Sequence, residues 1–366
     1  MDTVRFGIIG MGNIGVVHAE NLLAGRVRRG ELAAVASSSP RKREVWRQRG
    51  VKAFDDLGQM LQSRTVDAVI IATPHRQHVG LGIAALAAGV HVLMEKPIAA
   101  HKAEAEKLLA AHRQHPKTIF GCMYQLRVEP RFQKIRALIQ AGELGGIVRL
   151  NWINTDWYRT EAYYASGGWR ATWAGEGGGV LLNQCLHNLD ALQWLCGMPQ
   201  RLRGFCQFGR FHEIEVEDNV TAYLEWANGA TGVFVSSTGE APGTNRLEIA
   251  GTRGRLVLEN DRLQVTRNAV DMVEFSKGAT EGFVKPESHT TETGLEKSAH
   301  PHAAVAQNFV NAVLDGEPLI APGEEGLNAL ELANALTLSS LRGKTIELPM
   351  SGAAWQRQLE QLAATG

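Results

Sequence analysis

The first part of the chain, to about residue 120, alternates short apolar runs with amphipathic segments of helical length. The apolar runs are almost continuous, which is typical of parallel strands that helices cover on both faces. We expect strands at residues 4–9, 32–36, 66–72 and 90–94. Helices are expected after them, at residues 15–23, 41–49, 79–88 and 102–112. This order predicts a doubly wound α/β domain of the nucleotide-binding kind.

The pattern changes after Gly145, where apolar and polar positions alternate along longer runs. Alternation is typical of antiparallel strands with one buried face, and Asn228-Gly229 is a hairpin turn signal between two such runs. Strands are expected at residues 147–153, 220–226, 231–237, 247–250 and 256–258. Helices are expected at residues 130–141, 184–195, 301–314 and 323–341, and the polar segment 271–297 is expected to be a long loop. The second half is therefore predicted to be an α+β domain.

A length of 366 residues agrees with two domains, which we place at residues 1–122 and 123–366. The chain carries 38 basic and 38 acidic side chains, so nothing in its charge indicates a nucleic-acid or anionic-membrane partner. No apolar stretch reaches the ~20 residues that a membrane-spanning helix needs. The N-terminus enters a strand without the features of a signal peptide, so a cytoplasmic protein with reduced cysteines is expected.

A GxGxxG motif lies directly after the first predicted strand. Gly10 permits a tight turn, Gly12 lets the backbone approach a pyrophosphate, and Gly15 lets the helix pack on the strand. The helix N-terminus then faces the phosphate charge. Between a strand and a helix the motif predicts a dinucleotide site. Its six residues are Gly10, Met11, Gly12, Asn13, Ile14 and Gly15.

The end of the second strand bears on the choice between NAD and NADP. An acidic residue there would bind the ribose 2′-hydroxyl of NAD, but residues 36–43 contain none. Ser37, Ser38 and Arg41 are candidate contacts of a 2′-phosphate, together with two further cations, which slightly favours NADP over NAD. The alternative is that the cations at 41–43 form a solvated helical turn.

Polar residues follow two further strands, where ligands bind in open parallel sheets. Thr73, Pro74 and His78 follow one strand, and Glu95 and Lys96 follow the next. A Lys at such a place can hydrogen-bond both a substrate hydroxyl and the cofactor ribose. Because no acidic or Cys partner lies near His78 and its neighbouring His, we expect no metal.

A run of three glycines at 177–179 precedes Asn183 and His187. On a helix these two residues lie on one face, because they are four positions apart. Such a face can present an amide and an imidazole to one ligand. Both are therefore candidate catalytic and substrate-binding residues.

The four motifs, in this order and spacing, resemble the Gfo/Idh/MocA family (glucose-fructose oxidoreductase/inositol dehydrogenase), over nearly the whole chain. The resemblance implies a large, mainly antiparallel open sheet in the second domain, usually packed in a homodimer, homotetramer or larger homo-oligomer. The family's catalytic Lys falls on Lys96 and its catalytic His on His187, whereas its usual Asp position holds Asn183. Asn can orient a hydroxyl but cannot carry a negative charge. The resemblance also places His78 near the cofactor, and Trp169 and Arg170 across the nicotinamide end.

Seven of the 13 Trp and Tyr residues lie between positions 151 and 173. Flat aromatic faces with interspersed charges suit a carbohydrate, although ordinary core packing is the alternative. The candidate substrate contacts are Lys96, Tyr124, Arg127, Asp156, Trp157, Tyr158, Trp173, Asn183 and His187. This stretch resembles family members that oxidise glycosides at a ring hydroxyl such as C3. The acidic run 212–218 is expected to be the solvent face of a strand.

These observations predict an NAD(P)-dependent dehydrogenase of a sugar or glycoside, with His187 as general base and Lys96 beside the reacting oxygen. Two alternatives remain. One is redox-neutral cleavage of a glycoside with bound NAD. The other is a non-catalytic dinucleotide-binding regulator, which the presence of both Lys96 and His187 disfavours.

Overall fold

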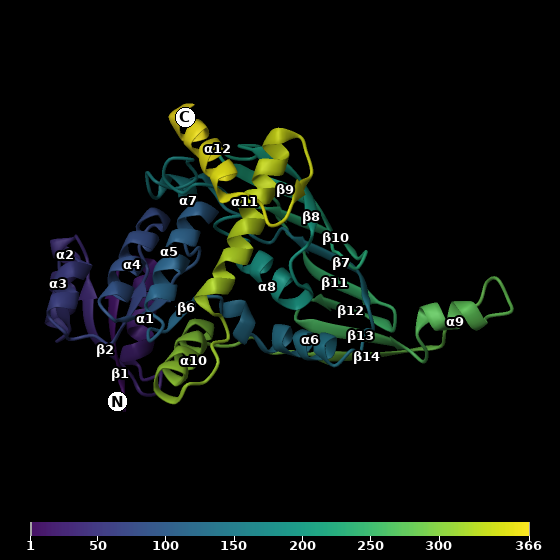
Figure 1. Ribbon diagram of the computed structural model, residues 1–366, viewed down its shortest axis with the longest axis horizontal. Helices are drawn as coiled ribbons and strands as arrows, with labels where there is room; N and C mark the ends of the chain where they lie inside the picture. Colours follow the sequence, from purple (N-terminus) through teal and green to yellow (C-terminus); the bar gives the residue numbers. More distant parts are fainter. Residues whose placement is uncertain (1, 366) are drawn as a thin grey trace. The chain divides into compact units, whose positions relative to one another are not determined.

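The computed structural model describes residues 2–365 and separates into two compact units (Figure 1). The first unit runs to residue 128 and takes up residues 299–330 again, and the second contains residues 129–298 and those from 331 onward. We predicted that the chain passes from the first domain to the second only once, between residues 122 and 123. The chain instead crosses near residue 128, and the return of residues 299–330 to the first unit was not foreseen. The last boundary falls within helix α11 (Gly326–Arg342).

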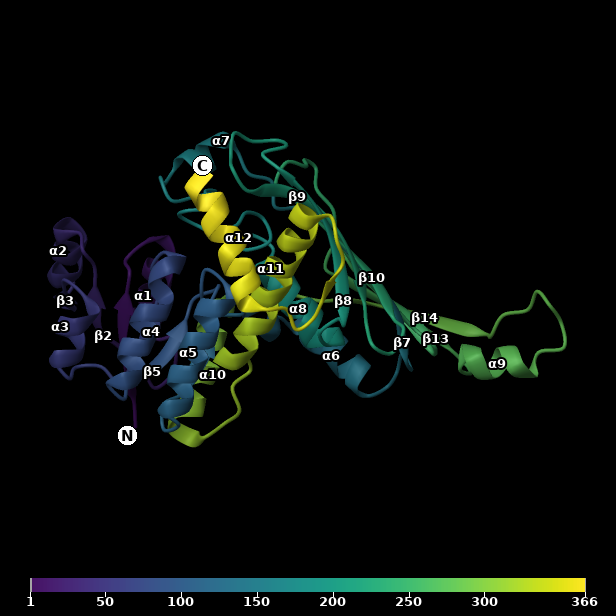
Figure 2. The ribbon, with the colours of Figure 1, turned by 45° about the horizontal axis from the view of Figure 1, so that its top comes forward.

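The first unit is built on a six-stranded sheet with the order β3-β2-β1-β4-β5-β6. All of its strand pairs are parallel, as the continuous apolar runs predicted. The strands are β1 (Val4–Ile9), β2 (Gly30–Ala36), β3 (Lys52–Phe54), β4 (Ala68–Ile71), β5 (His91–Met94) and β6 (Phe120–Cys122). The helices are α1 (Asn13–Leu23), α2 (Pro40–Gln48), α3 (Leu57–Gln62), α4 (His78–Ala87), α5 (Lys102–Gln114) and α10 (Pro301–Asp315). In both ribbon views α4 and α5 lie side by side (Figures 1 and 2).

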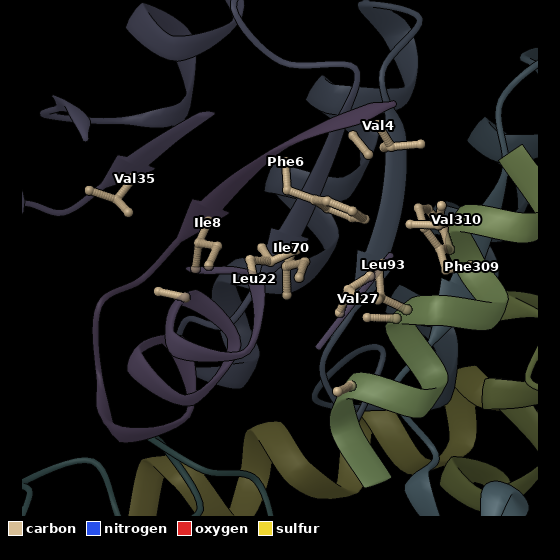
Figure 3. Close-up of a cluster of buried hydrophobic side chains, with 14 of the residues drawn as sticks. Val4, Phe6, Ile8, Leu22, Val27, Val35, Ile70, Leu93, Phe309 and Val310 are labelled. Atoms are coloured by element: carbon tan, nitrogen blue, oxygen red, sulfur yellow. The ribbon is translucent and has the colours of Figure 1, made fainter. Parts of the chain in front are cut away.

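Helix α10 belongs to the first unit because its apolar face completes the core of that sheet. Phe309 and Val310 are fully buried in one cluster with Phe6, Ile70 and Leu93 (Figure 3). The ring centroids of Phe6 and Phe309 lie 6.1 Å apart. Burying such side chains stabilises the fold by about 2 kcal/mol each, so the return of the chain to this sheet is favourable.

The second unit contains a nine-stranded sheet with the order β14-β13-β12-β11-β7-β10-β9-β8-β15. Its neighbours are antiparallel except β7 and β10, which confirms a large, mainly antiparallel sheet. The strands are β7 (Ile147–Asn154), β8 (Arg201–Phe208), β9 (Glu217–Glu225), β10 (Thr231–Ser237), β11 (Asn245–Gly251), β12 (Gly254–Glu259), β13 (Arg262–Asn268), β14 (Ser288–Gly294) and β15 (Ile346–Glu347). The helices are α6 (Pro130–Gln140), α7 (Glu161–Ala165), α8 (Leu186–Cys196), α9 (Met272–Gly278), most of α11, and α12 (Gly352–Thr365).

One face of this sheet is covered by helices, whereas its other face exposes apolar side chains. Phe132 of α6 packs on Trp152 of β7, with ring centroids 5.7 Å apart. On the open face, Phe205, Tyr223 and Val233 are 56%, 40% and 36% exposed. Cross-strand pairing of Tyr223 with Val233 places these two on the same face.

We predicted that the segment 271–297 is a long loop. This prediction is wrong, because the segment contains α9 and β14. Strand β14 pairs with β13 along its whole length, yet each of its seven residues is exposed. A strand with no buried face shows no apolar alternation, which explains why the pattern missed it. Both views show α9 beyond the ends of β13 and β14 (Figures 1 and 2).

The acidic run 212–218 is not the solvent face of a strand either. Strand β9 begins only at Glu217, and Glu217 and Asp218 are 1% and 0% exposed. The Asp218 carboxylate accepts the backbone N–H groups of Arg210, Phe211 and His212 at 3.0, 2.7 and 3.1 Å. The segment before β9 is therefore a turn that the buried Asp218 carboxylate holds through backbone N–H groups. Among the described residues no helix is long and apolar enough to cross a membrane.

Candidate active site

The glycine motif forms the turn between β1 and α1. Gly10 has a φ angle of +93°, and a Cβ there would lie 2.6 Å from the carbonyl oxygen of Ala72. A Cβ on Gly15 would lie 2.0 Å from the carbonyl oxygen of Gly10, so the helix can pack on the turn only with glycine here. A Cβ on Gly12 would meet nothing within 4 Å. The N-terminus of α1 thus faces open space, and this arrangement fits a bound pyrophosphate.

The remaining motif residues divide between core and surface. The side chain of Met11 is 3% exposed and lies in the hydrophobic core, so only its backbone can face a ligand. Asn13 is exposed and Ile14 is partly exposed, at the first positions of α1.

Of the three cationic side chains after β2, at positions 41–43, one is bonded to other residues of the protein. Ser39 caps α2, accepting the N–H of Lys42 at 3.4 Å. The Arg43 guanidinium donates to the carbonyl oxygen of Ser37 at 2.7 Å and pairs with Asp55 at 2.9 Å. The neighbouring side chains of Ser38, Arg41 and Lys42 are exposed. Because Arg43 is bonded to the protein, Arg41 and Lys42 are the cations of this run that can meet a 2′-phosphate.

Glu95 organises the start of the Glu-Lys-Pro motif after β5. Its Oε1 lies 2.8 Å from Nε2 of His18 in α1, and its Oε2 accepts the backbone N–H of Lys96 at 3.2 Å. Burial works to raise the pKa of Glu95, but the hydrogen bond and charge of His18, aided by His302 and Lys96, lower it to about 2. Glu95 is therefore a carboxylate at neutral pH that ties α1 to the backbone of Lys96.

His78 joins the segments that follow β4 and β5. Its ring nitrogens lie 2.7 Å from the carbonyl oxygen of Pro97 and 2.8 Å from that of Thr73. The side chain is fully buried, and this burial lowers its pKa against both hydrogen bonds. We expected His78 to contact the cofactor, but the structure surrounds it with protein atoms. By contrast, the buried Oγ1 of Thr73, beside Pro74, has no hydrogen-bond partner among the described residues, which fits a polar ligand there.

Tyr124 and Arg127 were expected to contact the substrate, and the structure buries both completely. The Tyr124 hydroxyl donates to the carbonyl oxygen of Gly326 at 3.4 Å. Arg127 donates to the carbonyl oxygen of Ile320 at 3.0 Å and pairs with Glu325. They anchor the returning segment 299–330 to the first unit, and this long-range contact could not be read from their place after a strand.

In the second unit, Glu217 holds the glycine run. Its Oε1 accepts the N–H groups of Gly179 and Leu181 at 2.9 and 3.1 Å. A Cβ on Gly179 would lie 2.0 Å from the carbonyl oxygen of Glu217, so the close approach requires glycine. Burial raises the pKa of Glu217 to about 7. Sequence reasoning missed this residue, since it treated the acidic run as solvated.

We expected Asn183 and His187 to share one face of a helix, but the structure contradicts this. Helix α8 begins at Leu186, so Asn183 lies in the preceding turn, where its N–H donates to the carbonyl oxygen of Gly179 at 2.9 Å. His187 occupies the first turn of α8 and is 6% exposed, whereas Asn183 is half-buried.

The side-chain amide of Asn183 lies in a polar cluster that the sequence did not indicate. Its Nδ2 donates to the Glu176 carboxylate and lies 3.4 Å from the Tyr163 hydroxyl oxygen. That hydroxyl also accepts from Arg170 at 3.0 Å and from Gln184 at 3.3 Å. Only the position of an acid directly before the glycine run could have pointed to Glu176.

The aromatic segment 151–173 is divided by the structure. Trp152 and Trp173 are 1% and 5% exposed and pack as core, which is the alternative weighed above. Tyr163, Trp169 and Arg170 form a half-buried stack, with the guanidinium 4.8 Å from each ring centroid.

Three of the predicted substrate-contact residues lie in the loop before α7, closer to the surface than Trp152 and Trp173. Asp156 is exposed and accepts from the amides of Asn154 and Asn245 at 2.9 and 3.1 Å. The indole N–H of Trp157 donates to the side-chain oxygen of Asn154 at 2.6 Å, and Tyr158 is 50% exposed.

A cavity of about 860 Å³ lies between α7 and the turn that follows β8. Its lining includes Tyr164, Arg170 and His212, whereas Asn183, His187 and Trp157 are not among its residues. The volume is in the range of small-molecule sites. No group of three or more His, Cys, Asp or Glu side chains within residues 2–365 could hold a metal ion.

Two family models match the chain. The model described as "Oxidoreductase family, NAD-binding Rossmann fold" matches residues 4–121. The model described as "GFO/IDH/MocA C-terminal domain" matches residues 132–257. Each match lies wholly within one unit of the structure.

Curated relatives and solved structures match over nearly the full length. The chain is 25% identical to the myo-inositol 2-dehydrogenase of Thermotoga maritima, over 94% of this chain and 98% of that protein. It is 24% identical to the scyllo-inositol 2-dehydrogenase (NAD(+)) of Bacillus subtilis, over 96% and 98% of the two chains. The WlbA dehydrogenase from Bordetella pertussis, solved in complex with NADH and UDP-GlcNAcA, has a TM-score of 0.79 at 25% identity and is covered completely, with 95% of this chain matched. The open glycine turn, the Glu-Lys-Pro motif and these full-length matches together show that the chain is an NAD(P)-dependent oxidoreductase of the Gfo/Idh/MocA family.

Proposed function

We propose that this protein is a dehydrogenase that transfers a hydride between nicotinamide and a ring hydroxyl or ketone of a sugar or glycoside, with C3 as the first carbon to test. The observation that carries the proposal is the turn at Gly12, open to a dinucleotide, in a chain that holds Lys96 in place through Glu95. The inositol dehydrogenases among its relatives act on a ring that carries hydroxyl groups.

The residues take the following roles. The bound nicotinamide supplies the hydride acceptor in the oxidation direction. His187 removes the proton of the reacting hydroxyl, a task suited to imidazole because its ordinary pKa lies near neutrality. Lys96 hydrogen-bonds the same oxygen and stabilises the charge that develops on it. Asn183 orients the hydroxyl, and the half-buried stack of Tyr163, Trp169 and Arg170 supplies aromatic surface.

NADP is proposed as the preferred cofactor. Support comes from the exposed Ser38, Arg41 and Lys42 after β2 and from the lack of an acidic residue at 36–43. A guanidinium can bind a 2′-phosphate through two parallel hydrogen bonds.

The test begins with release of the cofactor from purified protein by denaturation, and its identification by mass. Sugars, polyols and glycosides are then screened for reduction of that cofactor. Lys96→Ala and His187→Ala should each lower kcat by ~10²-fold or more while dinucleotide still binds. Turnover like that of the wild type in either variant contradicts the assignment of that residue. A released keto sugar supports the dehydrogenase, whereas an aglycone released with an unoxidised sugar indicates redox-neutral cleavage.

A further inference from the structure

We propose that Glu176 is a positioning residue, whose carboxylate holds the side-chain amide of Asn183 so that its carbonyl oxygen is presented to a substrate hydroxyl. This inference rests on the proposed dehydrogenase function, because it assigns Asn183 to substrate orientation. It concerns Asn183, at the position where the family resembled by these motifs usually has Asp.

Glu176 accepts hydrogen bonds from a backbone N–H and from the side-chain amide of Asn183. Glu176 is buried, with 2% of its surface exposed. Its Oε2 accepts the backbone N–H of Ala171 at 2.8 Å, and its Oε1 accepts Nδ2 of Asn183. An ionised carboxylate only accepts hydrogen bonds, so it satisfies both donors at once.

This pairing determines which way the amide of Asn183 faces. The amide nitrogen is directed at the Glu176 carboxylate and at the Tyr163 hydroxyl oxygen, 3.4 Å away. Exchange of the amide oxygen and nitrogen would place an oxygen against a carboxylate, which is unfavourable. With its nitrogen directed at these acceptors, the amide meets a ligand hydroxyl as an acceptor. Donation to an anionic partner also polarises the amide and strengthens that acceptor.

The negative charge that an Asp would carry at position 183 is therefore present one hydrogen bond away. The charge of Glu176 is felt inside the unit, since it adds to the effect of burial in raising the pKa of Glu217. A carboxylate at 176 and an amide at 183 together supply both the charge and a hydrogen-bond acceptor, without an ionisable group at position 183 itself.

The decisive experiment exchanges the two side chains. The N–H of Ala171 and the amide of Asn183 bond to different oxygens of Glu176. Glu176→Gln replaces one of these oxygens with an NH₂ group, so one of the two hydrogen bonds is lost and kcat/KM should fall about tenfold or more. Asn183→Asp places two carboxylates in contact, so kcat/KM should fall similarly at about pH 8 and recover in part at lower pH, where the pair shares a proton. The double variant E176Q/N183D restores a matched amide and carboxylate, and most of the lost kcat/KM should return.

A purely structural role gives a different result. If Glu176 only anchors the N–H of Ala171, then Gln keeps that bond, E176Q is as active as the wild type, and the inference is overturned. The inference is also overturned if the kcat/KM of the double variant is no higher than that of N183D. Glu129→Gln is the matched control, because Glu129 is a buried carboxylate that accepts one backbone N–H, that of Ser298 at 3.1 Å.

A second measurement separates this inference from the proposed function. If the wild type oxidises no sugar, polyol or glycoside, the proposed function fails, and the pairing is then judged by thermal unfolding alone. N183D should lower the midpoint of unfolding, and adding E176Q should raise it again. Strictly additive effects of the two substitutions would show that the side chains are not coupled, which overturns the inference whatever the activity.

Discussion

The buried Glu217 makes the stability of the second unit depend on pH. Its Oε1 accepts the N–H groups of Gly179 and Leu181, and its buried Oε2 has no partner among the described residues. The substitution Glu217→Gln keeps an acceptor for both N–H groups, because an amide oxygen has two lone pairs. It removes the charge that burial penalises. We therefore expect Gln to be tolerated and to be stabilising above neutral pH.

The magnitude follows from the difference between the folded and ordinary pKa values. Burial raises the pKa of Glu217 from 4.5 to about 7. A raised carboxyl pKa gives stability that is fully present below about pH 4.5 and is lost as the pH rises through about 7. At about 1.4 kcal/mol per pKa unit, ionisation of Glu217 costs about 3 kcal/mol of unfolding free energy at about pH 8. Most of this cost develops between about pH 5 and about pH 8.

Urea unfolding of the wild type and of Glu217→Gln, followed by tryptophan fluorescence from about pH 5 to about pH 8, measures this effect. The variant should gain on the wild type by about 2 kcal/mol or more across that interval. Parallel curves for the two proteins would refute the reasoning, since they would mean that Glu217 has the same pKa folded and unfolded.

The dinucleotide site gives two further predictions. Gly15→Ala should lower the midpoint of thermal unfolding, because its Cβ would lie 2.0 Å from the carbonyl oxygen of Gly10. Gly12→Ala, whose Cβ meets no protein atom within 4 Å, should leave the midpoint unchanged and weaken dinucleotide binding by about tenfold or more in calorimetry. Tight binding by Gly12→Ala would show that no ligand enters that space. Arg41→Ala should weaken NADP binding about tenfold and leave NAD binding unchanged, and an equal loss for both cofactors would count against a 2′-phosphate contact.

Much of the first unit could be predicted from the sequence because its signals are local. The strand predicted at residues 4–9 has those bounds in the structure, and the apolar run at 66–72 contains β4 (Ala68–Ile71). A parallel strand buried on both faces must be apolar throughout, so its pattern does not depend on its neighbours. The glycines at 10, 12 and 15 likewise act through the backbone of one turn, which a motif records directly.

The second unit was predicted in type but less well in its details. The strand at residues 231–237 has its predicted bounds, and the sheet is mainly antiparallel. The wholly exposed β14 was missed because it has no apolar face. The burial of Glu217 and Asp218 was missed because these two carboxylates are buried while they accept backbone N–H groups. Alternation of apolar and polar residues reports burial, and it cannot identify a polar group that is buried because it is hydrogen-bonded.

The sequence by itself determined the fold class, the dinucleotide site and the family. Each of these depends on short local patterns and on residues at fixed spacings within a motif. Only the tertiary structure decided which polar and aromatic residues face a ligand. Tyr124 and Arg127 are fully buried against residues about 200 positions away, and Trp173 packs as core. The side-chain amide of Asn183 donates to Glu176, on the far side of a glycine run. Such pairings depend on which segments pack together, and spacing along the chain does not contain that information.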